Sequence, residues 1–295
     1  MPMIVDPSAP HVTPPAVVTS PDGWLTAAVD GAHAGVWLRY QATHAPALPG
    51  ASTVRKVRIV RQDPGASAPA PVRSADPAWA VEGAGLAYDH EAPLGAAVVY
   101  AATPQFANGT WGPTSSLSVP VPAPAAGAVR DLWIKSLDEP GLSLAVTYAS
   151  RDGQTSSGRQ ETASRSASPF TAVAYDTASA PAETVKVDVL AADIARFRDL
   201  IRSGVLLAQV RPGYQIPDRY FVPGDVSEQP TGRLGSTGGY TVSFDIVPIE
   251  RPDTADAPLA VPGWSYDTLA AQFATYDAVA ASYPTYLALA SNGAI

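Results

Sequence analysis

Tyr240-Thr-Val-Ser-Phe-Asp-Ile246 alternates between apolar and polar side chains at every step. A period of two is typical of a β-strand that has one face in a core and the other in water. The same alternation recurs along the chain in short runs that are separated by turn-rich stretches. These runs are residues 36–40, 56–59, 98–102, 117–121, 142–146 and 185–189. The pattern predicts a mostly β protein.

Composition agrees with short strands and many turns. The 295 residues include 30 prolines and 23 glycines, more than average usage, and a chain of this length suits about two domains of ~150 residues. There is no cysteine, which excludes disulfides, thiol nucleophiles and Cys-ligated zinc. The net charge of −8 disfavours binding to nucleic acid or to an anionic membrane surface. No apolar run is long enough to predict membrane insertion.

The first half predicts a β-sandwich over residues 21–122. Residues 1–20 are rich in proline and lack periodicity, so we expect an extended N-terminal arm there. A proline-rich stretch of small residues follows the sandwich, and residues 123–127 are predicted to be a linker between domains.

Residues 128–252 predict a second β-rich domain that contains one helix. Leu190, Ile194, Phe197 and Ile201 form a single apolar stripe at helical spacing, and Gly204 suits the position after the helix. We expect the arginines of this helix to point to solvent. The polar segment 150–168 is predicted to be a long loop.

Residues 253–295 form a tail with a ten-residue repeat that predicts two or three short helices. Thr275 is placed as the N-cap of one of them. Such short helices are unstable alone and must pack on the body or on another protein. The repeat therefore supplies the candidate assembly interface, which comprises Tyr266, Leu269, Phe273, Tyr276, Val279, Tyr283, Tyr286 and Leu289.

No pattern predicts catalysis, a metal or a cofactor. The four histidines lack metal-ligand spacing, and we expect them to be surface residues. No nucleophile elbow, dinucleotide fingerprint or Walker A sequence occurs. The acid pairs Asp89 with Glu91 and Asp138 with Glu139 could suggest glycoside hydrolysis, but turns commonly carry such residues.

The tryptophans are candidate contact residues. Trp24 and Trp133 lie in predicted strands and are expected in the core. Trp111 lies in the loop segment 108–113 and is the candidate for an exposed contact, with packing in the core or within the turn as the alternative.

Three segments resemble minor tail proteins of phages and prophages of actinobacteria. The repeats Tyr266-Asp-Thr-Leu-Ala-Ala271, Thr275-Tyr-Asp-Ala-Val-Ala-Ala281 and Tyr283-Pro-Thr-Tyr-Leu-Ala-Leu289 are similar to their tandem T-W-A-D-L-L-A-A-Y-P tails. Tyrosine replaces the usual tryptophan, and Leu287 stands where aspartate is expected. Residues 88–100 resemble the end of their N-terminal sandwich, and residues 132–142 the opening of their second domain.

This resemblance implies a fold and a setting. The first domain resembles a fibronectin type III sandwich, with Trp24 as the strand-B tryptophan and Leu94-Gly95 as the turn before strand F. Val98 stands where the tyrosine-corner residue is expected, so another Ig-like sandwich is the alternative. The second domain looks like the tail-tube fold of distal-tail and hub proteins. The resemblance implies a trimeric or hexameric ring around the tail axis, in contact with the tail tube, the tape measure protein or tip proteins.

Three functions are compared on this basis. The leading prediction is a structural, non-enzymatic minor tail protein of the tail tip or baseplate, made in the host cytoplasm and located in the virion. Scarce lysine is compatible with sheet edges that pair with neighbours. The binding alternative is an adhesin module whose sandwich and Trp111 contact cell-wall glycan. The enzymatic alternative, a wall hydrolase, has no motif in its favour.

Overall fold

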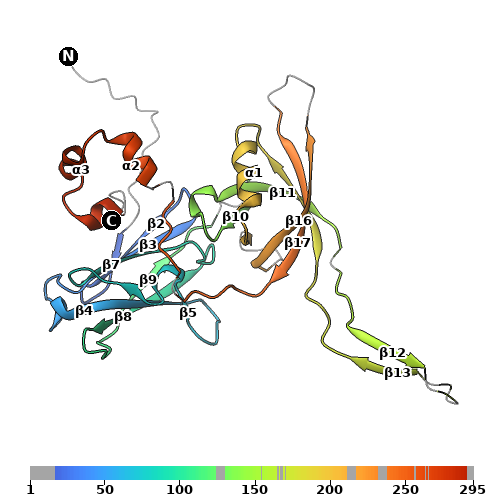
Figure 1. The fold of residues 1–295 in the computed structure, drawn as a ribbon, viewed down its shortest axis with the longest axis horizontal. Helices are drawn as coiled ribbons and strands as arrows, with labels where there is room; N and C mark the ends of the chain where they lie inside the picture. Colours follow the sequence, from blue (N-terminus) through green and yellow to red (C-terminus); the bar gives the residue numbers. More distant parts are fainter. Residues whose placement is uncertain are drawn as a thin grey trace.

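The computed structural model describes most of the chain: residues 17–123, 130–153, 155–164, 166, 169, 171–210, 217–231, 238–255, 257–262, 264 and 266–290. Within these residues strands dominate, and the helices are few and short (Figure 1). The mostly β fold class predicted from the alternating runs is confirmed. The linker predicted at residues 123–127 lies outside the described residues from position 124 onward.

The N-terminal domain is a sandwich of two antiparallel sheets. One sheet has the strand order β1-β2-β3-β7, and the other has the order β5-β4-β8-β9 with β6 also paired with β4. The strands are β1 (Val17–Thr19), β2 (Leu25–Asp30), β3 (Gly35–Gln41), β4 (Val54–Gln62), β5 (Ala70–Pro71), β6 (Ala78–Trp79), β7 (Ala84–Asp89), β8 (Ala97–Phe106) and β9 (Ser115–Pro120), with 3₁₀ turns at Ala51–Thr53 and Arg73–Ala75.

The inward residues of both sheets form one core. Leu38 and Tyr40 of β3 are buried with Ile59 of β4 and Tyr100 of β8, as the period of two requires. The fibronectin-III-like or Ig-like sandwich is therefore present, and the turn at Leu94-Gly95 leads into β8 as expected.

Two N-terminal predictions are corrected by the pairing. Trp24 precedes β2 and does not lie in a strand; it is half-buried, packs against the core, and its indole nitrogen donates to the carbonyl oxygen of Pro46 at 2.8 Å. The boundary predicted for the extended N-terminal arm, residues 1–20, is too far along the chain, because Val17–Thr19 already pairs with β2. Residues 1–16 lie outside the described residues.

The second domain is a closed antiparallel barrel with the strand order β10-β11-β14-β17-β16-β15. Closure removes the free edges that an open sheet would leave. Phe197, Phe221 and Phe244 are almost completely buried in its core. The elements are β10 (Leu132–Ser136), a 3₁₀ turn (Pro140–Leu142), β11 (Leu144–Arg151), β14 (Glu183–Val189), α1 (Ile194–Arg202), β15 (Leu206–Val210), β16 (Arg219–Pro230) and β17 (Tyr240–Ile249).

The predicted helix is present, but its buried residues include Leu200 and not Leu190. Leu190 precedes α1 and is 56% exposed, and Leu200 is buried beside Ile194 and Phe197. Arg196 does not point to solvent, since its guanidinium donates to the carbonyl oxygens of Gly141 and Ser143 at 2.7 and 2.6 Å. Gly204 follows the helix with a φ of 102°, the conformation that a residue in this position often adopts.

The loop predicted at residues 150–168 is wrong in part. β11 continues to Arg151, and β12 (Gln160–Ser164) pairs with β13 (Thr171–Tyr175). These two strands form a ribbon that projects from the barrel (Figure 1). The alternation of apolar and polar residues did not predict this ribbon, because both of its faces are exposed and its sequence therefore does not alternate.

The tail forms three short helices, as the repeat predicts: α2 (Tyr266–Gln272), α3 (Tyr276–Ser282) and α4 (Tyr286–Ala290). Thr275 caps α3, because its hydroxyl accepts a hydrogen bond from the backbone nitrogen of Ala278 at 3.3 Å. No described helix is long and apolar enough to span a membrane.

Candidate functional site: the domain joint, the arm and the tail

Paired residues of β10 and β15 on the outer face of the barrel contact the sandwich. Trp133 and Lys135 of β10 alternate with the inward Leu132 and Ile134, and Gln209 of β15 pairs with Trp133. Trp133 packs against the core of the sandwich, and Gln209 donates to the carbonyl oxygen of Ala92 at 3.1 Å. The contact of Trp133, Lys135 and Gln209 with residues 88–92 of the sandwich is called the domain joint below.

Lys135 is the centre of the domain joint. Its side chain is fully buried, and its ammonium donates to the carbonyl oxygens of Ala34 and His90 at 2.7 and 2.8 Å. Burial lowers the pKa of this ammonium to about 7. Lys135 lies on the outer face of the barrel, opposite the inward Ile134, and the sandwich covers that face.

A buried ion pair supports the sandwich side of the joint. The Arg61 guanidinium contacts the Asp89 carboxylate at 2.7 Å, and the hydroxyl of Tyr100 donates to the same carboxylate at 2.8 Å. Although burial opposes it, the charge of Arg61 holds the pKa of Asp89 below its usual range. Asp89 therefore serves as a buried structural anion.

Glu91 ties the sandwich to the segment that follows β17 of the barrel. Its carboxylate accepts from Arg73 at 2.9 Å and from Arg251 at 2.6 Å, and Arg251 also donates to the carbonyl oxygen of Pro71. Burial acts against ionisation, but the hydrogen bond and charge of Arg251 lower the pKa of Glu91. The acid pair of Asp89 and Glu91 is thus occupied by arginines, an arrangement that suits structure.

His90 corrects the prediction that all histidines lie on the surface. It is 3% exposed, and neither ring nitrogen has a hydrogen-bond partner among the described residues. Burial lowers the pKa of the imidazole to about 4, so the ring is neutral at pH 7. His33 and His44 are more exposed, as expected, and His11 lies outside the described residues.

The domain joint unites two of the three segments that carry the resemblance. Lys135 belongs to the segment 132–142, and its acceptor His90 belongs to the segment 88–100. Sequence reasoning named both segments but did not bring them together. The only signal was Lys135 itself, one of three lysines in the chain, placed beside a tryptophan in a strand.

The tail folds around its own aromatic residues. Tyr283 lies edge-on to Trp264 and Phe273, with ring centroids 5.7 and 5.8 Å apart, and the Trp264 indole donates to the carbonyl oxygen of Leu289 at 2.6 Å. Ala290 packs on a small cluster around Trp37 on the outer face of the sandwich. The tail therefore covers part of the β2-β3-β7 sheet.

The candidate interface residues divide into two groups. Tyr266 and Tyr276 are 88% and 89% exposed, so they are available to a partner. Half-buried residues face the interior of the tail; they are Leu269, Phe273, Val279, Tyr283 and Leu289. The side chain of Tyr286 lies outside the described part of the structure.

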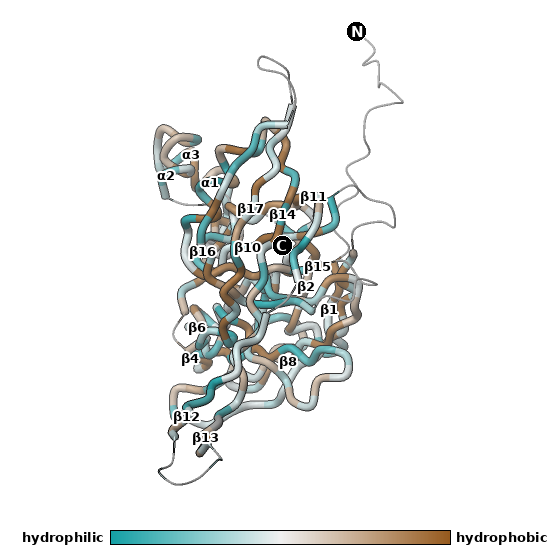
Figure 2. The backbone as a smooth tube through the Cα atoms, turned by 90° about the vertical axis from the view of Figure 1, so that its right-hand side faces the viewer, coloured by the Kyte–Doolittle hydropathy of each residue, from teal (hydrophilic) through white to brown (hydrophobic). Residues whose placement is uncertain are grey.

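The ribbon of β12 and β13, called the arm below, is the most exposed element. Every side chain of β12 and of residues 171–174 is exposed. Thr155 and Ala182 close its base through two hydrogen bonds of 3.0 Å. Figure 2 shows the hydrophobic segments gathered in the body of the molecule and away from β12. An isolated ribbon of two strands is marginally stable in water.

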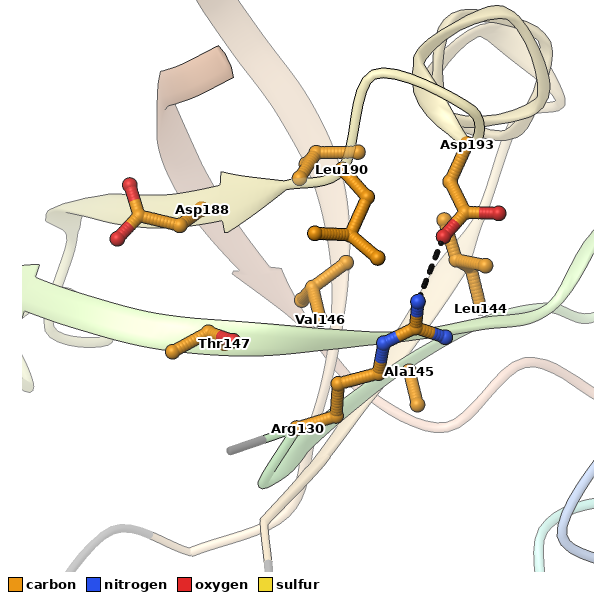
Figure 3. A pocket seen from close by; sticks show the side chains of 9 residues that line it. Arg130, Leu144, Ala145, Val146, Thr147, Asp188, Leu190 and Asp193 are labelled. Carbon is orange, nitrogen blue, oxygen red and sulfur yellow. Dashed lines mark hydrogen bonds and ion pairs between the residues drawn. The ribbon is translucent and has the colours of Figure 1, made fainter. Parts of the chain in front are cut away.

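A pocket of about 200 Å³ lies where β11 and β14 separate. Figure 3 shows Arg130 reaching across its mouth to Asp193, at a distance of 3.0 Å. The rest of the lining is mostly apolar, with Thr147 and Asp188 as its polar residues; the apolar residues are Leu144, Ala145, Val146, Val189 and Leu190. Arg130 is held in the ion pair with Asp193, so its guanidinium closes one side of a mostly apolar hollow.

Trp111 is 49% exposed, and its role as a contact residue stays a prediction. Trp79, which sequence reasoning did not select, is 72% exposed. Within the described residues, no group of three potential ligands is arranged to hold a metal ion.

No protein-family model and no curated protein matches the sequence.

Proposed function

We propose that this chain is a structural, non-enzymatic minor tail protein of a bacteriophage tail tip or baseplate. It assembles into a ring with copies of itself, a trimer or a hexamer, through the barrel, the arm and the tail. The other partners proposed are the tail tube, the tape measure protein and tip proteins, and the location is the virion. The resemblance of the three segments supplies the setting, and the arm supplies the physical argument.

The arm is the observation that carries this proposal. Its strand β13, Thr171-Ala-Val-Ala-Tyr175, has no charge and no proline, the two features that usually block the pairing of an exposed strand edge. Since no described side chain of the arm is buried, its stability in the assembled state must come from another molecule. A second copy in a head-to-tail ring supplies such a contact for every arm.

The domain joint supports a structural role. Its acids are paired with arginines and its lysine donates to backbone carbonyls, so the charged groups hold the two domains together. A ring subunit benefits from a fixed angle between its domains, because every interface then repeats the same geometry.

The test is the mass of the purified full chain in solution, measured by light scattering at several concentrations. In the comparison variant, Thr155 is joined to Ala182 by an Asn-Gly turn, which suits a hydrogen-bonded pair at the end of a hairpin. We expect a trimer or hexamer for the full chain and a monomer for the variant, with unchanged circular dichroism of the body.

A chain that ends at Pro262 removes the tail helices and keeps the contacts of residues 251–254 with the sandwich. If the tail also contributes to the ring, this chain assembles more weakly than the full chain. A full chain that remains monomeric at every concentration would contradict the proposed self-assembly.

A further inference from the structure

Four side chains form one row across the outer face of the sandwich. Trp79 of β6 pairs with Lys56 of β4, Lys56 pairs with Gln105 of β8, and Gln105 pairs with Trp111. Directly paired residues of antiparallel strands carry their side chains on the same face. The row, called the tryptophan row below, therefore has an indole at each end and two polar groups between them.

The row faces solvent. Val57, the neighbour of Lys56 along β4, is 1% exposed and belongs to the core, so Lys56 points to the opposite side. Trp79 and Trp111 are 72% and 49% exposed. None of these residues belongs to the domain joint, the arm or the tail.

Local contacts hold both ends of the row in place. The Lys56 ammonium lies 4.7 Å from the ring centroid of Trp79. Before Trp111, the turn is closed by Asn108, whose side-chain oxygen accepts from the backbone and the hydroxyl of Thr110 at 3.0 and 2.7 Å. Gln105 also donates to the carbonyl oxygen of Gly109 at 3.2 Å. These contacts reduce the entropy lost on binding.

A second, polar row runs beside the first. Arg58 pairs with Thr103 one step further along β4 and β8, and the hydroxyl of Thr103 lies 2.8 Å from that of Thr114. The Arg58 guanidinium is oriented by Asp76 at 2.8 Å. The face therefore offers hydroxyl and guanidinium groups next to the indoles.

The spacing of the two tryptophans differs from the spacing of residues in a protein-binding hot spot. Three strand spacings put the backbones that carry the two indoles ~14 Å apart, a span of roughly three linked pyranose rings. Hot spots at protein interfaces cluster in a desolvated centre, whereas these tryptophans are separated by two polar side chains. A chain of flat rings with hydroxyl edges matches the alternation of aromatic and polar groups.

We propose that the tryptophan row binds a β-1,4-linked polysaccharide of the kind found in cell walls. The indoles stack on the C–H faces of the pyranose rings, while Lys56 and Gln105 bond to hydroxyl or acetamido groups. An extended β-1,4 chain fits a row on a sheet, and an α-1,4 chain coils away from it. This proposal does not rest on the ring assembly.

The test is isothermal titration of the full chain with the hexamer of β-1,4-linked N-acetylglucosamine, with maltohexaose as the α-1,4 control. We expect the β-linked hexamer alone to bind. The Trp79→Ala and Trp111→Ala variants each weaken binding about tenfold, because each loses one stacking contact. Trp111→Phe retains part of the affinity, and Val99→Ala, a change at a 42% exposed side chain of the same β8, leaves it unchanged.

The absence of binding to the β-linked hexamer overturns the proposal, as does equal binding by the double tryptophan variant. A double variant that changes the oligomeric mass while glycan binding persists assigns the row to an interface between proteins, which also overturns it. Circular dichroism of each variant shows whether the sandwich remains folded.

Discussion

The ammonium of Lys135 lies 2.7 Å from the carbonyl oxygen of Ala34 and joins the barrel to a turn of the sandwich. The two residues are 101 positions apart in the chain. A charged side chain without solvent contact is stabilised only by the partners that surround it. The lysine therefore makes the barrel and the sandwich depend on each other.

Replacing Lys135 with methionine tests this dependence. The apolar side chain is of similar length but leaves the carbonyl oxygens of Ala34 and His90 without their buried donor. We expect a loss of about 2–4 kcal/mol in the free energy of unfolding, measured by urea denaturation at pH 7. Lys186→Met, at a side chain 42% exposed, is the control and should change it by less than about 0.5 kcal/mol. Equal effects of the two changes would contradict a structural role for Lys135.

Glu91→Gln removes the charge that two arginines share. The Glu91 side chain is fully buried, so the variant leaves Arg73 and Arg251 without their anion. We expect a loss of about 3–5 kcal/mol in unfolding free energy. The matched change is Glu228→Gln, in a partly exposed pair with Arg198 at 2.6 Å, where the loss should stay below about 1 kcal/mol. A small effect at Glu91 would show that the joint does not need this ion pair.

His90 makes stability depend on acidic pH. Its pKa is lowered from 6.5 to about 4 in the folded chain, so below pH 6.5 the unfolded chain binds the extra proton first. The unfolding free energy therefore falls as the pH decreases from 6.5 to 4, by up to about 3 kcal/mol from this residue.

The phenylalanine variant His90→Phe lacks this titration. We expect the difference in unfolding free energy between the original chain and the variant to change across pH 4–6.5 and to level off above it. His44→Phe, at an exposed side chain, serves as the control. A difference that stays constant over the whole window would rule out a buried neutral imidazole at position 90.

Trp264→Ala should release the tail without unfolding the body. The change removes the hydrogen bond to Leu289 and the edge contact with Tyr283. Limited proteolysis should then cut within residues 266–290 faster, while the urea midpoint of the body stays the same. Tyr276→Ala, at a side chain 89% exposed, should leave the cleavage rate unchanged. If both variants are cut at the original rate, the tail does not depend on this cluster.

The sequence predicted those elements in which burial leaves a regular trace. The strands of the barrel and sandwich have one face in a core, so their apolar residues recur every second position, as in Tyr240 to Ile246. The tail helices were found through their repeat and the cap at Thr275. The arm was missed because neither face of β12 is buried.

The candidate sites depended on distant contacts that no local pattern encodes. Lys135 is buried only through its contact with the segment around His90, which lies 45 positions away in the chain. In the same way, Trp79 reaches the row of Trp111 only through the register of β6, β4 and β8. Sequence reasoning could name Trp111 as exposed, yet it could not supply the second indole.

The contacts of the domain joint couple the two domains mechanically. Lys135 and Gln209 bind the sandwich from β10 and β15, and Arg251 binds it from the segment that follows β17. A pull on the sandwich would load these contacts side by side, so tension would be divided among them. Force applied at the outer face of the sandwich would then reach the barrel as torque, without being absorbed by an elastic hinge.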